Sequence, residues 1–147
     1  MEREIERKFL VKDTSFISLS RQSLCIQQAY LSKDPARTVR VRISNDQGWI
    51  TIKGKSDSSG LSRLEWEKEI PLEEAKELLL LCLPGTILKT RYMVPYEASE
   101  VVVDVFEDPK KMILAEVELP SLDAPFTPPN WLGEEVTGNP EYYNSNL

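Results

Sequence analysis

Charged and apolar residues alternate along several short segments of this chain, and that alternation limits the folds that the chain can form. Arg40 and Arg42 alternate with three β-branched residues in Val39–Ile43, and Glu116 and Glu118 alternate with aliphatic residues further along the chain. Successive side chains of a β-strand point to opposite faces of the sheet. Each segment therefore predicts a strand with one ionic face and one apolar face.

Turn sequences divide the chain into eight such segments. Examples are Asn45–Gly48 and Asp57–Gly60, which are rich in residues that favour turns. Short strands at even spacing are typical of a barrel or of two packed sheets. The predicted strands are Glu2–Val11, Cys25–Ser32, Thr38–Ser44, Gly48–Ser56, Leu61–Ile70, Ile87–Tyr96, Glu100–Glu107 and Ile113–Leu119.

Helical signals are confined to two places. The segment Leu72–Leu83 follows Pro71, carries acidic residues in its first turn and stops at a Pro-Gly pair, which predicts a helix. A shorter helix is predicted around Thr14–Leu24. The proline-rich tail from Pro120 predicts a loop, with a terminal turn near Pro140–Asn146.

Composition narrows the class of protein. A chain of 147 residues, 41% of them hydrophobic, predicts one folded domain over residues 1–147. It shows no signal-peptide pattern, and its longest apolar run, Leu78–Leu83, is too short to span a bilayer, so we expect a soluble, cytoplasmic protein. Histidine is absent, which excludes histidine-based nucleophilic catalysis and most zinc sites. The net charge of −6 disfavours nucleic acid and anionic membrane as partners.

The ionic faces of the predicted strands have two interpretations. They are either the solvated outer faces of half-buried strands, or they turn inward around a shared cavity. Cations and carboxylates are segregated by strand, and arginines two residues apart suit forked contacts with phosphate oxygens, which favours the second interpretation. Because charge in a dry core is very costly, the inward arrangement requires a hydrated channel. It also requires a polyanion for the cations and a hard divalent ion, Mg²⁺ or Mn²⁺, for the carboxylates.

Ordered sequence elements along almost the whole chain resemble a known family. The segment Glu4-Ile5-Glu6-Arg7-Lys8 matches the ExExK signature of the CYTH superfamily, the triphosphate tunnel metalloenzymes. It is followed in order by QQAYL, VRVR, TIKGK, SRLEWE, LKTRY, VDVF, AEVEL and PPNWLGEEVTG. The resemblance implies a mainly β fold: a closed eight-stranded antiparallel barrel, or tunnel, with a charged interior and a few flanking helices.

The resemblance also implies an activity. The EIERKFLV start, the SRLEWE strand and the WLGEEVTG tail are similar to compact bacterial members that hydrolyse tripolyphosphate. We therefore expect hydrolysis of a small triphosphate, foremost inorganic tripolyphosphate, by a water that is activated by Mg²⁺ or Mn²⁺ and a carboxylate. Adenylyl cyclase activity, thiamine or nucleoside triphosphatase activity and non-catalytic polyphosphate binding stay open. So do the number of metals, the choice between monomer and homodimer, and the closure of one tunnel mouth, because the chain stops soon after WLGEEVTG.

Motif positions imply roles for the ionic residues. The expected catalytic residues are Glu4, Glu6, Lys89 and Glu118. The expected substrate-binding residues are Lys8, Arg40, Arg42, Lys53, Lys55, Arg63, Lys89 and Arg91. The expected metal ligands are Glu4, Glu6, Asp104, Glu116 and Glu118, and the expected supporting carboxylates are Glu65 and Glu67.

Overall fold

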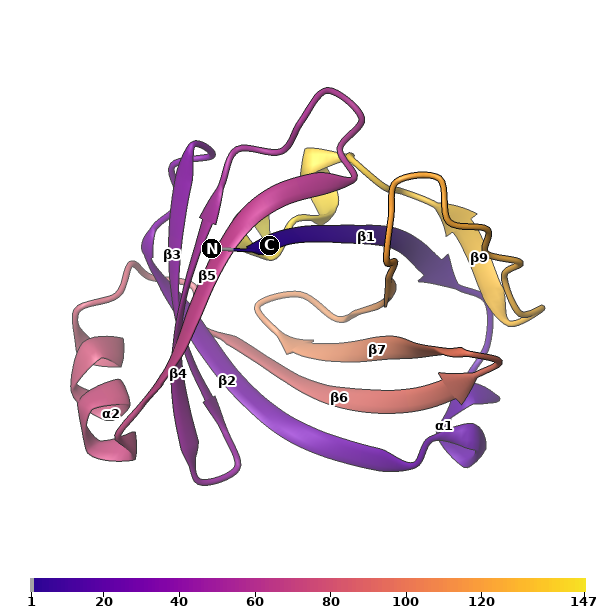
Figure 1. The fold of residues 1–147 in the computed structure, drawn as a ribbon. Helices are drawn as coiled ribbons and strands as arrows, with labels where there is room; N and C mark the ends of the chain where they lie inside the picture. The colour runs from indigo at the N-terminus through magenta and orange to yellow at the C-terminus, as the bar shows by residue number, and fades with distance from the viewer. Residues whose placement is uncertain (1) are drawn as a thin grey trace.

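Nine β-strands form one antiparallel sheet in the computed structural model, which describes the backbone of residues 2–147 and the side chains of residues 3–147 (Figure 1). The sheet order is β5-β4-β3-β2-β6-β7-β8-β1-β9, and an additional pairing of β5 with β1 closes all strands except β9 into a barrel. The closed antiparallel barrel expected from the sequence is confirmed. The strands are β1 (Glu2–Val11), β2 (Gln22–Ser32), β3 (Arg37–Ser44), β4 (Gln47–Gly54), β5 (Ser62–Ile70), β6 (Ile87–Tyr96), β7 (Ser99–Asp108), β8 (Met112–Glu118) and β9 (Leu132–Glu135).

Helices form only short parts of the fold. They are α1 (Phe16–Leu19), α2 (Leu72–Leu80) and the 3-10 turns η1 (Pro140–Tyr142) and η2 (Asn144–Asn146). Helix α2 begins at the predicted residue but ends before Leu83, because the Leu83 backbone N–H donates to the Tyr30 carbonyl oxygen at 2.8 Å. Within the described backbone, no helix has the length and apolar character needed to cross a membrane.

The predicted helix over Thr14–Leu24 is wrong for most of its length. Only Phe16–Leu19 is helical, and Gln22–Leu24 already belongs to β2. These residues pair with β6, where Leu24 lies opposite Arg91. Hydrogen bonds to a neighbouring strand therefore replace the helical bonds that the local sequence predicts.

One edge of β1 is shared by two partners. Its first part pairs with β5, where Glu4 lies opposite Arg63, and its last part pairs with β9, where Phe9 lies opposite Glu135. The sequence predicted a loop for the β9 region, so this strand was missed. The terminal turn predicted near Pro140–Asn146 is confirmed as η1 and η2.

The main apolar core lies outside the barrel, between its wall and the segments that cover it. Phe16 of α1 packs against Tyr92 and Trp131, with ring centroids 5.6 and 5.7 Å away. On another part of the wall, α2 approaches β4 so closely that a Cβ at Gly48 would lie 2.5 Å from the Ala75 Cβ. The buried core residues are Phe9, Phe16, Val94, Val101, Val103, Ala115, Val117, Leu119, Trp131 and Leu132. Since these residues pack outward, the inward faces of the strands are free to carry polar groups.

Truncating Phe16 tests this outer core. Phe16 has no exposed surface, so Phe16→Ala is expected to lower the free energy of unfolding by about 3–5 kcal/mol. The neighbouring Ile17 is 45% exposed, and Ile17→Ala is expected to change stability by less than about 0.5 kcal/mol. Urea denaturation followed by tryptophan fluorescence measures both variants. Equal stability losses in the two variants would contradict the burial of Phe16 between α1 and the outer face of the barrel.

Candidate functional site

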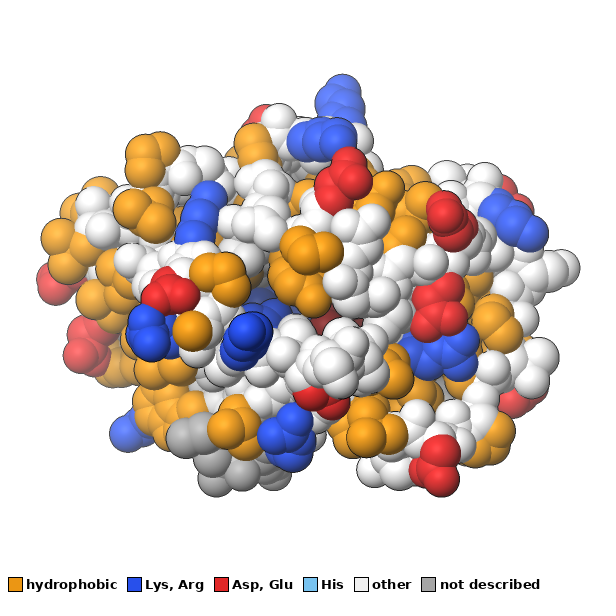
Figure 2. All heavy atoms as spheres, turned by 90° about the horizontal axis from the view of Figure 1, so that it is seen from above, with side chains coloured by type: hydrophobic (Ala, Val, Ile, Leu, Met, Phe, Trp, Pro, Cys, Tyr) orange, Lys and Arg blue, Asp and Glu red, His pale blue; other side chains and the backbone are white. Residues whose placement is uncertain are grey.

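A cavity of about 1000 Å³ lies inside the barrel. Figure 2 shows basic and acidic side chains in the depth of a hollow in the face seen from above. Ligand pockets in proteins reach about this volume, so a small molecule would fit. The ionic lining residues are Glu4, Glu6, Lys8, Arg40, Arg42, Lys53, Arg63, Glu65, Glu67, Arg91, Glu100, Glu116 and Glu118. Of the two interpretations of the ionic faces, the inward one is confirmed.

Two arginines of β3 lack complete sets of partners. The Arg40 Nε is buried and has no hydrogen-bond partner among the described side chains, although Arg40 Nη2 donates to Thr51 Oγ1 at 3.1 Å. Arg42 forms no ion pair within residues 3–147, and its Nε donates to Gln28 Oε1 at 3.2 Å. Burial, and then the charges of Arg40 and Arg91, lower the pKa of Arg42 well below its usual value. Buried cations in this state favour an anionic ligand.

Carboxylates of β1 and β8 lie on the opposite side of the barrel from β3. In the strand register Glu6 lies opposite Glu118, and Lys8 lies opposite Glu116. Burial, and then the charge of Glu116, raise the pKa of Glu6 well above its usual value. Burial also disfavours the charge of Glu116, but Lys8 and a hydrogen bond with Glu6 outweigh it and lower the pKa of Glu116. Two buried carboxylates this close therefore disfavour a second negative charge, which a bound cation would offset.

Strand β5 adds two carboxylates, Glu65 and Glu67, which lie near cations of β4 and β3. Lys53 Nζ lies 2.9 Å from Glu4 Oε1 and 3.6 Å from Glu65 Oε2. Burial and a hydrogen bond with Glu4 raise the pKa of Glu65 to about 7. Glu67 Oε2 lies 3.6 Å from Arg40 Nη2. Glu65 and Glu67 thus lie beside cations of the cavity, and their role as supporting carboxylates stays a prediction.

The carboxylates fit a divalent metal that is completed by other ligands. No group of three acidic or cysteine side chains within residues 3–147 is arranged to hold a metal ion by itself. Two pairs do approach through hydrogen bonds, Glu6 with Glu116 and Glu4 with Glu65. Mg²⁺ commonly binds to one or two carboxylates and takes its remaining ligands from water and substrate phosphates. The donor set therefore suits Mg²⁺ or the similar Mn²⁺.

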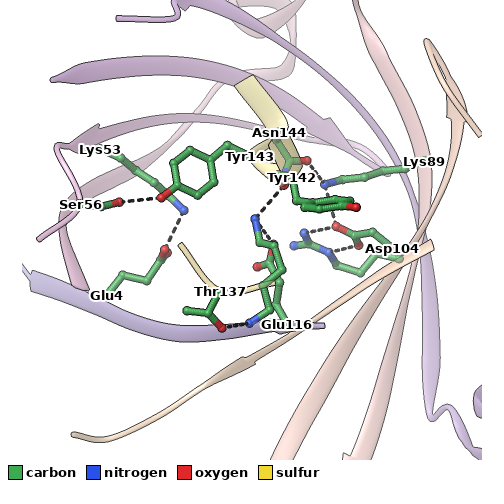
Figure 3. Close-up of polar contacts among 12 residues, drawn as sticks. Glu4, Lys53, Ser56, Lys89, Asp104, Glu116, Thr137, Tyr142, Tyr143 and Asn144 are labelled. Atoms are coloured by element: carbon green, nitrogen blue, oxygen red, sulfur yellow. Dashed lines mark hydrogen bonds and ion pairs between the residues drawn. The ribbon is translucent and has the colours of Figure 1, made fainter. Parts of the chain in front are cut away.

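Asp104 forms a buried ion cluster with two cations of β6 (Figure 3). Its Oδ2 lies 2.7 Å from Lys89 Nζ, and Arg91 donates to both of its oxygens at 2.8 and 2.9 Å. Burial opposes the charge of Asp104, but Arg91 and Lys89 lower its pKa far below the usual value. Burial likewise lowers the pKa of Lys89 to about 7, against the opposing effect of Asp104.

This cluster lies partly behind the cavity surface. Arg91 is a lining residue, whereas Lys89 and Asp104 are 3% exposed and lie outside the lining set. With both oxygens bonded to cations, Asp104 positions Lys89 and Arg91. Its expected role as a metal ligand stays a prediction, and these contacts do not favour it.

The other predicted substrate-binding residues differ in their placement. Arg63 lines the cavity, donates from Nε to the Gly54 carbonyl oxygen at 3.1 Å and stacks on the Tyr143 ring at 5.6 Å. Lys55 is exposed just beyond the end of β4 and is not among the lining residues. A sequence motif marked Lys55, but the strand ends before its side chain reaches an inward position.

Three polar residues at the cavity or directly behind its lining were not predicted. Gln28 is fully buried and lies between Arg42 and Asn144, with its Nε2 donating to Asn144 Oδ1 at 3.2 Å. Its inward position follows from strand alternation with Tyr30, so a signal for Gln28 existed. Tyr143 and Asn144 belong to no alternating segment, and no pattern in the sequence marks them.

The fold and the site define a closed antiparallel barrel whose lumen is an ionic tunnel. Residues 2–146 match the CYTH domain model, and the chain belongs to this family. It is 45% identical over 149 residues to an inorganic triphosphatase of Acetivibrio thermocellus, covering 100% of this chain and 94% of the relative. It is 34% identical over 148 residues to an inorganic triphosphatase of Nitrosomonas europaea, covering 98% and 95%. The resemblance drawn from the sequence is thereby confirmed.

Solved structures agree with this assignment. A crystal structure of an inorganic triphosphatase superposes with a TM-score of 0.66 at 30% identity, covering 99% of this chain and 94% of that chain. A plant protein from Hippeastrum, described as a putative adenylyl cyclase with a dominant triphosphatase activity, shares the fold with a TM-score of 0.67 at 15% identity, and the match covers 80% of each chain.

Proposed function

We propose that this protein hydrolyses a small triphosphate, with inorganic tripolyphosphate as its preferred substrate and Mg²⁺ or Mn²⁺ as its metal. The observation that carries this proposal is the pair Arg40 and Arg42 on the inward face of β3: the buried Arg40 Nε has no hydrogen-bond partner among the described side chains, and Arg42 forms no ion pair within residues 3–147. A triphosphate is a compact polyanion that offers oxygens to several such donors at once. Two relatives named inorganic triphosphatase support the same substrate, and triphosphatases of this family are metal-dependent in general.

The cations bind and neutralise the phosphates. Arginine presents a planar fork that matches two phosphate oxygens, so Arg40 and Arg42 orient the triphosphate. Arg91 adds positive charge at the cavity surface while its Nε and Nη2 donate to Asp104. Phosphoryl transfer depends mainly on positioning and on stabilising negative charge, and these tasks need no nucleophilic side chain. Lys89 contributes a buried positive charge next to Arg91, where Asp104 holds it. The full phosphate-binding set in this proposal is Lys8, Arg40, Arg42, Lys53, Arg63, Lys89 and Arg91.

The carboxylates bind the metal and the attacking water. When bound, the metal neutralises phosphate charge and makes water a better nucleophile. Glu4, Glu6, Glu116 and Glu118 are its proposed ligands, and all four line the cavity. A cavity carboxylate that is not bound to the metal orients the water and accepts its proton.

Removal and return of the metal test the proposed function. Purified protein with Mg²⁺ or Mn²⁺ is expected to release orthophosphate from tripolyphosphate, and EDTA is expected to abolish the release until metal is added in excess. A panel of tripolyphosphate, ATP, GTP and thiamine triphosphate measures substrate preference. With ATP, orthophosphate indicates hydrolysis, whereas cyclic nucleotide and pyrophosphate indicate a cyclase. The proposal fails when no triphosphate yields orthophosphate.

A further inference from the structure

Glu100 is an ionic residue of the cavity lining to which neither the sequence motifs nor the proposed mechanism gives a role. It lies near the start of β7, opposite Pro95 of β6. Met93, Ala98 and Pro120 line the cavity with it, and Ala98 and Pro120 are exposed. The cavity therefore meets solvent beside the β6–β7 turn. We call this opening, lined by Met93, Ala98, Glu100 and Pro120, the β7 mouth.

A carboxylate at the β7 mouth works against an anionic substrate. Val101 lies opposite Val117, so Glu100 and Glu118 follow at neighbouring positions of β7 and β8. A polyphosphate that approaches the mouth meets both negative charges, and like charges repel more strongly outside bulk water. The net charge of −6 on the whole chain adds to this repulsion. Entry of a polyanion at the β7 mouth therefore calls for a cation there.

Arg21 supplies a cation at the β7 mouth. Its Nε donates to Glu100 Oε2 at 2.5 Å and its Nη2 donates to Glu100 Oε1 at 3.1 Å, so the two groups meet fork to fork. Its Nη1 donates to Gln22 Oε1 at 3.2 Å. These three contacts give the guanidinium one orientation beside the lining residue Glu100.

The backbone of Arg21 is also fixed at the β7 mouth. Its N–H donates to the Met93 carbonyl oxygen at 2.9 Å, and the next residue, Gln22, pairs with Met93 at the start of β2. Helix α1 ends at Leu19, just before Arg21, and Figure 1 shows α1 beside the end of β6. Backbone pairing thus attaches Arg21 to one lining residue, and its side chain attaches it to another.

The Arg21 guanidinium is oriented without being buried. The Arg21 side chain is 52% exposed and that of Glu100 is 32% exposed. An exposed arginine–carboxylate pair is weak because water screens it, so an incoming anion can replace the carboxylate at little cost. Phosphate presents two oxygens to the guanidinium fork as a carboxylate does. Arg91 differs in this respect, because its fork is held by the buried Asp104.

From this geometry we infer that Arg21 is the entrance residue of the cavity: it neutralises Glu100 at the β7 mouth and binds the first phosphate group that arrives from solvent. The inference rests on the proposed function in one respect, since the anion that enters is the proposed polyphosphate. The phosphate then passes from Arg21 to the cations deeper in the barrel. Charges at the rim of a binding site act mainly on the association rate and on its salt dependence, and this is where the effect of Arg21 is expected.

Association rates measured without metal test the entrance role. Phosphorus NMR line shapes of tripolyphosphate titrated with metal-free protein give the association rate constant without turnover. At low ionic strength, Arg21→Gln is expected to lower this constant by about three- to tenfold, because the mouth loses its cation and keeps its carboxylate. At about 0.5 M salt the difference is expected to shrink to less than about twofold, because salt screens exposed charges. Equal rate constants for the parent and Arg21→Gln at low salt would overturn the inference.

Two companion variants separate neutralisation of Glu100 from capture by the guanidinium. Glu100→Gln removes the opposing charge and leaves Arg21 in place, so association is expected to be at least as fast as in the parent. The double variant Arg21→Gln/Glu100→Gln has a neutral mouth but no guanidinium, and its rate constant is expected to lie between those of Arg21→Gln and the parent. Full recovery in the double variant would refute capture by Arg21, and no recovery would refute neutralisation of Glu100.

Arg37→Gln is the matched control for overall charge. Arg37 is an exposed arginine that pairs with Asp34 and is not among the residues that line the cavity. Its replacement makes the same change in net charge as Arg21→Gln, so it is expected to associate with tripolyphosphate like the parent. Equal slowing in Arg21→Gln and Arg37→Gln would show a general effect of charge and would overturn the entrance role.

Steady-state kinetics separate the entrance role from the proposed hydrolysis. Arg21→Gln is expected to lower kcat/KM by about the same factor as the association rate and to leave kcat within about twofold of the parent, since the reacting groups lie deeper in the barrel. If the parent hydrolyses tripolyphosphate but Arg21→Gln associates at the parent rate, the entrance role is refuted and hydrolysis stands. If Arg21→Gln slows association but the parent releases no phosphate from any triphosphate, hydrolysis is refuted and the entrance role stands.

Discussion

Glu6→Gln is expected to lower the turnover of tripolyphosphate by about 100-fold or more, since removing one preorganised charged group from an active site commonly costs that much. Glutamine keeps the shape of the side chain but loses the negative charge proposed to bind the metal. The metal concentration that gives half-maximal activity is expected to rise as well. Steady-state kinetics over a Mg²⁺ titration measures both effects, and Glu107→Gln, an exposed carboxylate on the outer face of β7, is the matched control.

Glu6→Gln is also expected to affect stability, and here the variant is expected to be at least as stable as the parent although its turnover is lower. Burial and Glu116 raise the pKa of Glu6 in the folded protein, so its ionised form is less favourable there than in the unfolded chain. Above the unfolded pKa, that difference destabilises the metal-free protein, and a neutral glutamine removes it. Metal-free Glu6→Gln is therefore expected to unfold at the same or a higher temperature than the parent at pH 7.

The turnover of Glu6→Gln decides the role of Glu6 in the site. Normal turnover in Glu6→Gln would exclude Glu6 from the metal site.

Arg42→Ala is expected to raise the KM for tripolyphosphate by about 10- to 150-fold, which corresponds to the loss of one charge-assisted contact worth about 1.5–3 kcal/mol. Arg42 has no carboxylate partner within residues 3–147, so its charge is available to the substrate. The affinity of the metal-free protein for tripolyphosphate, measured by calorimetry, is expected to fall by a similar factor. An unchanged KM would remove Arg42 from the site.

Two further variants separate the charge of Arg42 from its shape. Arg42→Lys keeps the positive charge but loses the planar fork, so its KM is expected to lie between those of the parent and Arg42→Ala. Arg37→Ala removes an arginine from the exposed start of the same strand and is expected to bind substrate like the parent. Equal defects in Arg42→Ala and Arg37→Ala would indicate a general effect of charge on the protein surface.

Much of the barrel could be predicted because the information is local. A period of two residues, as in Val39–Ile43, determines which side chains share a face, and neighbouring turn residues mark where each strand stops. The predictions failed where distant pairing determines the structure. Gln22–Leu24 has no strong strand pattern but extends β2 along β6, and Leu132–Glu135 becomes a strand because the edge of β1 beyond β5 is free to pair with it.

The candidate site shows the same division. Alternation correctly assigned Arg40, Arg42 and Lys53 to the cavity, since inward or outward direction follows from position in the strand. Depth within the tunnel does not follow from alternation. Asp104 and Lys89 are inward-facing but are covered by neighbouring groups, and Lys55 lies past the end of its strand. These differences depend on where each strand ends and on which side chains pack over the inward face.

The sequence by itself determined the family, most of the strands and the ionic character of one face of several of them, because a two-residue period and ordered motifs are properties of neighbouring residues. Only the tertiary structure decided that these faces enclose one cavity, that Asp104 binds Lys89 and Arg91, and that Asn144 and Tyr143 reach the phosphate-binding cations. The physical reason is that hydrogen bonds and ion pairs depend on distance in space and not on separation along the sequence. Residues far apart along the chain, such as Gln28 and Asn144, come within hydrogen-bonding distance only after the barrel closes.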